Sequence, residues 1–271
     1  MSNQTTTPML KFSKGNAKLP KTTLIFSLPA GHTCPGAKDC KSFVTINEDG
    51  KRRLEDGPDN QFRCYAATSE AVYPAVFEAR KHNHDLLLPI SRNVDAMVKF
   101  ILESMHAKGM DKITKVRVHE SGDYFTLSYF KAWMKVAAVF PNIKFYSYTK
   151  SLPFIVKGKK EGIIPSNFYF TASKGGQFDY LIAESGFKSV TVTTTETETL
   201  AAETLGGKFD HDDELALGSE DFFLQVHGQQ PAGTESAKYW DTLVREKRGG
   251  YSKRTKKIRA DKTAKNAAKA A

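Results

Sequence analysis

Between residues 115 and 228, short strand patterns alternate with helix patterns, and this alternation constrains the fold more than any other feature. The strand patterns are rich in β-branched and aromatic residues, whereas the helix patterns repeat apolar residues every three or four positions. An earlier apolar run, "TTLIFSL" at 22–28, adds a strand that ends at Pro29. The predicted strands are 22–28, 115–120, 144–149, 167–173, 188–195 and 221–228, and the helices between the later ones are 126–140, 151–162, 178–186 and 198–207.

Strands separated by helices are typical of an α/β protein with a parallel sheet and right-handed crossovers. Six such strands can form a partial (βα)6 barrel or an open, doubly wound sheet. Before residue 115, helices are expected over 68–83 and over 94–105, the second ended by Gly109. The run "VTINEDGKRRLEDG" at 44–57 is interpreted as a hairpin with Asp49-Gly50 at its turn, or as a polar excursion between Cys40 and Cys64.

Polar, glycine-rich and metal-capable residues gather where the predicted strands end. "AGHTC" follows the first strand, "ESGD" the second, "TKS" the third, "SKGG" the fourth and "HGQQ" the last. Junctions from helix to strand, such as "KGMDKIT", lack this enrichment. Ligands bind at the carboxyl ends of the strands in both parallel architectures, so we expect one functional face there.

All three cysteines lie in the segment that follows the first strand. Cys34 and Cys40 belong to "GHTCPGAKDC", and Cys64 follows in "FRCYAA". Three cysteines cannot all pair, and no apolar run has the length of a signal peptide or a membrane span. A protein of the reducing cytoplasm, without disulfides and without a membrane partner, is therefore expected.

Thiolates at Cys34, Cys40 and Cys64 can bind zinc or an iron–sulfur cluster. A structural zinc site needs a fourth protein ligand, which His32 or His82 would have to supply. A [4Fe–4S] cluster held by three cysteines leaves one iron open to a further ligand, which suits S-adenosylmethionine chemistry. We predict the cluster, with zinc as the alternative metal and unliganded thiols as a third interpretation.

Other candidates follow the later strands. His119 and Asp123 suit acid–base catalysis or cofactor binding, with a structural His–Asp pair as the alternative. Lys150 could place a cation against a substrate carboxylate or phosphate, or it could be a solvated lysine. "SKGGQFD" at 173–179 resembles a phosphate-binding glycine turn. "DHDDE" at 210–214 is interpreted as a solvated acidic loop rather than a cation site.

Positive charge is concentrated at the C-terminus of the chain, whose net charge is +10. Residues 245–271 hold 11 Lys and Arg against two acidic residues, so that residues 1–244 are nearly neutral. This segment has few apolar residues and is expected to be a disordered tail that attracts nucleic-acid phosphates, with a solubility tail as the alternative. The predicted organisation is one folded domain over 1–244, with the cysteine-bearing loop after its first strand, and a basic tail over 245–271.

Five strings that occur in order resemble the bacteriophage gene product 88 family over roughly residues 8–235. They are "SLPAGHTCPGAKDC", "CYAA", "VRVHESGDYFT", "FYSYTKSL" and "VHGQQPAG". The resemblance implies a phage protein that acts in the host cytoplasm.

More loosely, the layout resembles radical S-adenosylmethionine enzymes, with cysteines after the first strand and an aromatic residue, Tyr65, beside the last cysteine. The "ESGD" turn would correspond to the Gly-Gly-Glu turn that holds the methionine amino group in such enzymes. The cysteine spacing departs from their C-x3-C-x2-C motif, since five residues separate Cys34 from Cys40 and 23 separate Cys40 from Cys64.

The preferred interpretation is a phage iron–sulfur protein with a partial (βα)6 barrel, and an S-adenosylmethionine-dependent enzyme acting on or near nucleic acid if it catalyses a reaction. The alternative is a non-enzymatic iron–sulfur or zinc protein that binds nucleic acid or a host partner. The expected roles are catalysis for His119, Asp123 and Lys150; cofactor binding for Tyr65, Ser121, Gly122, Asp123 and His227; and metal binding for Cys34, Cys40 and Cys64.

Overall fold

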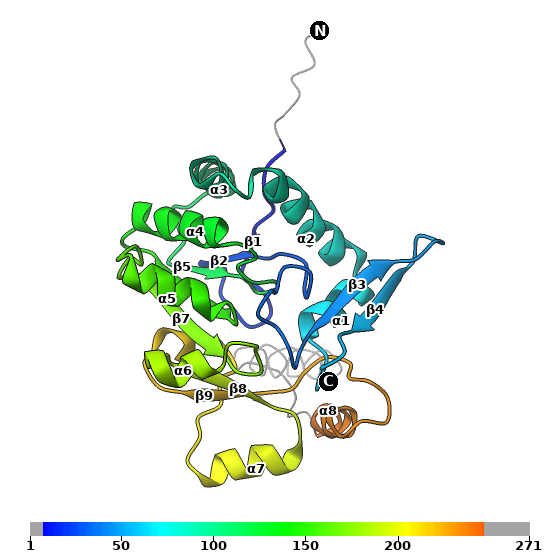
Figure 1. Cartoon of the computed structure of the whole chain (residues 1–271). Coiled ribbons are helices and arrows are strands. Elements are labelled where there is room, and N and C mark those ends of the chain that lie inside the picture. Colours follow the sequence, from blue (N-terminus) through cyan, green and yellow to red (C-terminus); the bar gives the residue numbers. More distant parts are fainter. Residues whose placement is uncertain (1–7, 247–271) are drawn as a thin grey trace, which may run out of the picture.

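The computed structural model describes residues 8–246 and contains the parallel sheet expected from the sequence (Figure 1). Seven strands form this sheet in the order β1-β2-β5-β6-β7-β8-β9. Strand β1 pairs antiparallel with β2, and every later pairing is parallel. The predicted strands are confirmed, and β1 is an addition. The strands are β1 (Ser13–Lys14), β2 (Thr23–Phe26), β5 (Lys115–Val118), β6 (Lys144–Thr149), β7 (Phe168–Ser173), β8 (Ser189–Thr193) and β9 (Phe222–Gln225).

The order of the parallel strands never reverses, because each strand is added on the far side of the one before it. A doubly wound sheet reverses at a switch point and carries helices on both faces. Right-handed crossovers that always advance in one direction place their helices on one face instead. Four helices lie along the outside of the sheet in Figure 1, namely α4 (Leu127–Val139), α5 (Leu152–Lys160), α6 (Tyr180–Ser185) and α7 (Glu196–Thr204).

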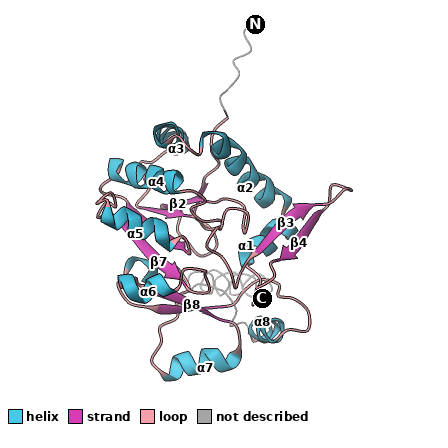
Figure 2. Cartoon of the chain, viewed as in Figure 1, coloured by secondary structure: helices cyan, strands magenta, loops and turns pink. Residues whose placement is uncertain are grey.

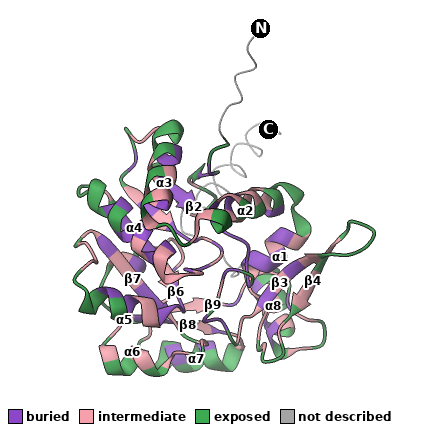
Figure 3. Ribbon diagram, turned by 45° about the horizontal axis from the view of Figure 1, so that its top comes forward, coloured by how far each residue is buried: buried purple, intermediate pink, exposed green. Residues whose placement is uncertain are grey.

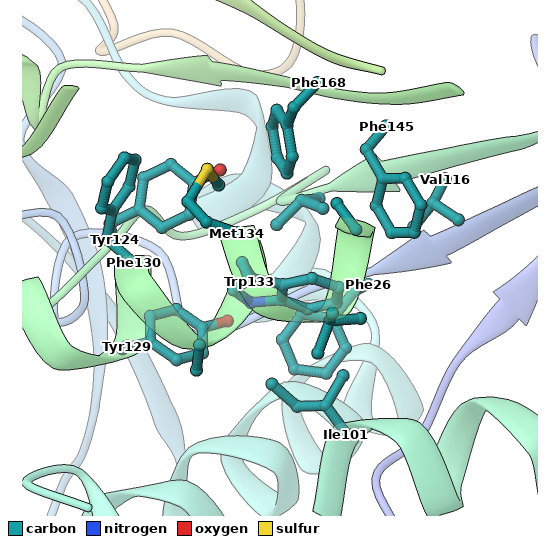
Figure 4. Close-up of a cluster of buried hydrophobic side chains, with 14 of the residues drawn as sticks. Phe26, Ile101, Val116, Tyr124, Tyr129, Phe130, Trp133, Met134, Phe145 and Phe168 are labelled. Atoms are coloured by element: carbon teal, nitrogen blue, oxygen red, sulfur yellow. The ribbon is translucent and has the colours of Figure 1, made fainter. Parts of the chain in front are cut away.

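The main hydrophobic core lies between the sheet and helices α4 and α5, and α3 (Val94–Lys108) adds side chains to it. Val116 and Val118 of β5 belong to it together with Phe130 and Trp133 of α4 (Figure 4). Burial of each such side chain stabilises the fold by about 1.5–3 kcal/mol. Arg117 lies between the two valines in the strand, and strand alternation therefore directs it to the opposite face of the sheet.

The helical region before β5 departs from the prediction at one proline. The sequence predicts a single helix over 68–83, but the structure has α1 (Tyr65–Val72) and α2 (Pro74–Leu87). Tyr73 lies between them in an extended conformation, with φ −108° and ψ 107°. A residue before proline disfavours the helical conformation, whereas proline itself is favoured at the first position of a helix. Pro74 therefore ends one helix and begins the next.

The hairpin predicted over 44–57 is present as β3 (Ser42–Ile46) and β4 (Arg52–Asp56), a separate antiparallel sheet beside α1 (Figure 2). The helix predicted over 94–105 is α3 (Val94–Lys108), and it ends at Gly109 as expected. Residues 8–246 also contain two short 3-10 helices, at Leu88–Ile90 and Leu215–Leu217.

Helix α8 (Glu235–Arg245) was not anticipated from the sequence. It begins at Thr234, whose hydroxyl accepts a hydrogen bond from the backbone N–H of Ala237 at 3.2 Å. It buries Tyr239 and Leu243, so the folded part continues through the point where the basic tail is predicted to start. The rest of that predicted tail, residues 247–271, lies outside the described residues.

Exposed residues cover the outer faces of α2, α3 and α7, whereas strands β2 and β6 are mostly buried (Figure 3). Among residues 8–246, every helix is too short or too polar to cross a membrane.

Candidate functional site

A cavity of about 440 Å³ lies against the face of the sheet opposite the core. Its wall includes Arg117, which strand alternation directs to that face. The expected site residues come from the chain segments that follow β2, β5, β6 and β9, and the carboxyl ends of parallel strands meet at one edge of a sheet. The structure therefore brings the whole set together, while the individual roles stay predictions. All of its members line the cavity: Cys34, Cys40, Cys64, Tyr65, His119, Ser121, Gly122, Asp123, Lys150 and His227.

Cys34 and Cys40 lie on a loop that crosses the carboxyl edge of the sheet from β2 to the loop after β7. The backbone N–H of Asp39 donates to the carbonyl of Gly175 at 3.0 Å. A Cβ on Gly36 would lie 2.3 Å from a backbone oxygen, so only glycine permits this close approach. The glycine at position 36 thus allows the cysteine loop to pack closely against the strand ends.

The ammonium of Lys150 secures the end of β7. It donates to the carbonyl and the hydroxyl of Ser173 at 2.8 and 2.9 Å, and also to the carbonyl of Lys174. Lys150 is only 7% exposed, which excludes the alternative of a solvated lysine. Its three donors are used by the protein, so that contact with a substrate anion would require one of these bonds to break.

The three thiols share an unfavourable electrostatic environment. Burial and the charge of Cys40 raise the pKa of the Cys64 thiol to about 11, although the backbone N–H groups of Ala66 and Ala67 oppose the rise. Burial also raises the pKa of Cys34 and of Cys40. The charges of Cys64 and Cys40 raise the pKa of Cys34 further. The charge of Lys150 opposes the rise in the pKa of Cys40, and a further cationic group among the three thiolates would favour their ionisation.

The two histidines that could complete a zinc site are each close to a backbone carbonyl. His32 Nε2 is 3.0 Å from the carbonyl of Val44, and His82 Nε2 is 2.9 Å from that of Met9. Within residues 8–246 no group of three or more His, Cys, Asp or Glu side chains converges on a single metal position. A cubane cluster does not require such convergence, because each thiolate binds a different iron.

The turn after β5 packs directly on the cysteine loop. Gly122 has φ 81°, and a Cβ there would lie 2.5 Å from the hydroxyl oxygen of Thr33. Neighbouring Asp123 joins this turn to the end of β6, since its carboxylate accepts hydrogen bonds from the Thr149 hydroxyl at 2.6 Å and the Lys150 backbone N–H at 2.8 Å. Burial raises the pKa of Asp123, and these hydrogen bonds oppose the rise.

Glu70 of α1 connects three parts of the site, although no sequence pattern singled it out. Its Oε1 accepts hydrogen bonds from the backbone N–H of Ala30 at 2.9 Å, the guanidinium of Arg80 at 2.9 Å and the hydroxyl of Ser121 at 3.3 Å. Its Oε2 is buried and has no partner within the described part of the chain. One signal in the sequence could have indicated a buried acidic partner such as Glu70. Arg80 shares the buried face of α2 with Phe77, and a charge on such a face needs a partner.

His119 has φ 70°, which is uncommon for a residue other than glycine. Its Nε2 is 3.0 Å from the hydroxyl of Tyr129, and its Nδ1 is buried without a partner among residues 8–246. The alternative of a hydrogen-bonded pair with Asp123 is therefore not formed. Burial lowers the pKa of His119 to about 3, so the imidazole is neutral at pH 7.

His227 and Tyr65 form a stack on the cavity wall. Their ring centroids are 4.4 Å apart and their planes differ by 26°. The Tyr65 hydroxyl donates to the carbonyl of Glu120, which fixes the ring beside the turn after β5. Burial lowers the pKa of His227 to about 3, and the charges of Lys18 and Arg117 contribute to this shift.

The acidic loop 210–214 does not behave as the solvated loop that the sequence predicts. Asp213 accepts hydrogen bonds from Arg117 at 2.6 Å, Tyr146 at 3.0 Å and Tyr148 at 3.2 Å. The buried guanidinium on the cavity face of β5 requires a counter-charge, and this loop supplies it. Asp213 itself adopts φ 62° to do so.

The glycine turn at 173–179 is not open to a phosphate in this structure. The backbone N–H groups of Gly175 and Gly176 donate to the Asp179 carboxylate at 2.7 and 3.0 Å. The amides that a phosphate would use are thus occupied by the chain itself.

A family model described as "Gene product 88" matches residues 9–265. This match includes most of the basic C-terminal segment, which the resemblance in the sequence left out. The Gene 88 protein of Mycobacterium phage D29 is 28% identical over 112 residues, covering 40% of this chain and 47% of the relative. The Gene 88 protein of Mycobacterium phage L5 is 31% identical over 90 residues, covering 32% of this chain and 38% of the relative.

The chain thus spans less than half the length of these curated relatives. No solved structure matches it significantly. These matches support the phage family and do not extend to radical S-adenosylmethionine enzymes. Because the family model covers nearly the whole sequence, this chain belongs to the gene product 88 family.

Proposed function

We propose that this protein holds a [4Fe–4S]-type cluster on Cys34, Cys40 and Cys64, at the carboxyl edge of a partial (βα)6 barrel. The observation that carries the proposal is that every cysteine of the chain lines one cavity at the strand ends. Desolvation of the three half-buried thiols and repulsion between their thiolate forms make ionisation costly unless a cationic group binds them.

The barrel interpretation is supported by the sheet itself. Six parallel strands follow one another without reversal, the crossover helices lie on one face, and the cavity lies on the other. A (βα) barrel arranges its helices outside the strands and its functional loops at the carboxyl ends in the same way.

A cluster held by three thiolates leaves one iron for an external ligand, and S-adenosylmethionine bound there would supply radical chemistry. The chain's own residues would then orient the cofactor. Ser121 and Gly122 lie on the turn that Glu70 holds against the cysteine loop, and the Tyr65–His227 stack offers a flat surface beside it. The Nδ1 of His119 has no hydrogen-bond partner among residues 8–246, so this neutral imidazole would be free to hydrogen-bond a bound ligand through that atom.

The rival function is a non-enzymatic metalloprotein that binds nucleic acid or a host partner, with the metal organising the loop between Cys34 and Cys64. Both versions act in the host cytoplasm, and both assign nucleic-acid binding to the basic segment 245–271. They differ in whether the open cluster position binds S-adenosylmethionine.

Anaerobic purification followed by iron, zinc and sulfide analysis tests the metal assignment. We expect iron with an equal amount of acid-labile sulfide, and a sharp loss of both in Cys34→Ala, Cys40→Ala or Cys64→Ala. Ser69→Ala is a matched control, because Ser69 lines the same cavity, and it should retain the cluster. Stoichiometric zinc without sulfide would overturn the proposal and leave the zinc-binding version of the rival function.

A further inference from the structure

The cavity wall also contains a half-buried cation that forms no ion pair within residues 8–246. Lys18, from the connection between β1 and β2, lines the cavity together with Arg117, Asp210 and Asp213. These three residues and Glu120 are the charges that act on Lys18. The charges that act on the thiols are instead those of Asp123, Lys150, Glu70, Asp39 and the thiols themselves.

The acidic groups near Lys18 are engaged elsewhere. Asp213 accepts from Arg117 and from two tyrosine hydroxyls. Asp210 accepts the backbone N–H groups of Asp212 and Leu215, each at 3.1 Å. Within residues 8–246 the Lys18 ammonium makes no ion pair within 4.0 Å of a carboxylate, and burial lowers its pKa. A half-buried ammonium in this situation gains from an oxyanion that enters the cavity.

Part of the cavity wall is apolar. Val190 and Val192 of β8 and Leu224 of β9 line it, whereas strand neighbours such as Thr191 are absent from the lining. A ligand that contacted both the Lys18 ammonium and this apolar wall would combine an oxyanion with an apolar portion. Its dimensions would be those of a small organic molecule, because the cavity measures about 440 Å³ in total.

We propose that the gene product 88 cavity binds a small organic acid, a carboxylate or a phosphate monoester, with its oxyanion on Lys18 and its apolar portion on the wall formed by Val190, Val192 and Leu224. The role of this ligand as a substrate rests on the proposed function, whereas its binding does not. Lys18 then takes the anion-binding role that the sequence suggested for Lys150.

Benzoate, phenyl phosphate and the uncharged benzyl alcohol serve as probes for the purified full-length protein, with ligand-observed NMR at low ionic strength as the readout. We expect one or both anions to bind at least tenfold more tightly than benzyl alcohol. Comparing the two anions distinguishes a carboxylate ligand from a phosphate. Inorganic phosphate, tested in parallel, shows how much of the affinity comes from the apolar portion.

Lys18→Met removes the charge and retains most of the length of the side chain. It should weaken anion binding roughly tenfold to a hundredfold, the range for loss of a charge-assisted hydrogen bond. Lys18→Arg should retain most of the affinity. Lys21→Met is the matched control, because Lys21 is exposed nearby in the same connection and does not line the cavity, and it should bind as the wild type does.

Equal binding of the neutral probe, or unchanged anion affinity in Lys18→Met, would overturn the inference. Iron and sulfide content measured on the same samples separates it from the proposed function. A sample with a cluster but without Lys18-dependent anion binding contradicts the inference alone. A sample that binds anions through Lys18 but never contains iron and sulfide contradicts the cluster and leaves the anion site in place.

Discussion

The carboxylate of Glu70 lies 2.9 Å from the guanidinium of Arg80, and both side chains are almost inaccessible to solvent, at 1% and 7% exposed. This pair connects α1 to α2. Because α1 begins immediately after Cys64, and because Glu70 also accepts hydrogen bonds from Ala30 and Ser121, the pair fixes the last cysteine relative to the other two parts of the site.

Removing the charge of Glu70 should therefore destabilise the fold. Glu70→Gln leaves the buried guanidinium of Arg80 without its near counter-charge, and we expect the free energy of unfolding to fall by about 3–5 kcal/mol. Urea denaturation followed by circular dichroism measures the change. The exposed pair of Lys81 and Asp85 on the same helix is the control, and Asp85→Asn should cost no more than about 0.5 kcal/mol. Similar losses in the two variants would contradict the assigned importance of the buried pair.

The pH dependence of stability should report the buried histidines. Burial lowers the pKa of His119 from 6.5 in the unfolded chain to about 3, so between these values the unfolded state binds a proton that the folded state does not. Stability is then fully present above pH 6.5 and falls as the pH drops toward 3, by up to about 1.4 kcal/mol per pH unit. His227 should contribute in the same direction.

His119→Asn tests this contribution, because asparagine tolerates the positive φ at this position. Urea denaturation between pH 5 and pH 6.5 should show a shallower loss of stability in the variant than in the wild type. His106→Asn, at an exposed position on α3, should retain the wild-type slope. An unchanged slope in His119→Asn would mean that His119 is not held neutral by the fold.

Local sequence patterns were sufficient to predict the strands of the parallel sheet and the edge of that sheet at which the site lies. Strand periodicity located β2 and β5 to β9, and the chemistry of strand ends identified the cysteines and the turn around Gly122. Both depend on residues close together in the sequence. The split at Pro74 was also local, and the preference of residues before proline for extended conformations would have predicted it.

Long-range partners could not be predicted in this way. Glu70 is recognised as part of the site only when α1 and α2 pack together, and Lys18 only when the connection before β2 meets the cavity face of β5. From the sequence alone, Asp213 is interpreted as a surface acid, because its partner Arg117 lies 96 positions away. In each case the sequence shows the charge but not the element that desolvates or neutralises it.

Binding of S-adenosylmethionine separates the enzymatic from the non-enzymatic function. We expect calorimetry to detect it with the cluster-loaded protein and to find it weakened in Asp123→Ala, because Asp123 holds the turn containing Ser121 and Gly122 against the end of β6. Thermal unfolding should accompany the measurement, since a variant that no longer folds would weaken binding trivially. Thr149→Ser, which retains the hydroxyl donor to Asp123, is the control. Absence of binding to the loaded wild type, or equal affinity in folded Asp123→Ala, would favour the non-enzymatic function.

The basic C-terminal segment should supply the salt-dependent part of nucleic-acid binding. Because α8 extends to Arg245, the proper truncation ends at Glu246 rather than at Val244. It removes ten Lys and Arg and one acidic residue, and leaves a nearly neutral protein. If about five side chains each neutralise one phosphate of duplex DNA, log affinity should fall against log salt with a slope of about −4 to −5 in the full chain and close to zero in the truncated one.

Fluorescence anisotropy over a salt series measures both slopes, and iron content should be equal in the two proteins because the removed segment contains no cysteine. Equal affinities and slopes would show that the segment serves solubility and that any contact with nucleic acid comes from the folded part.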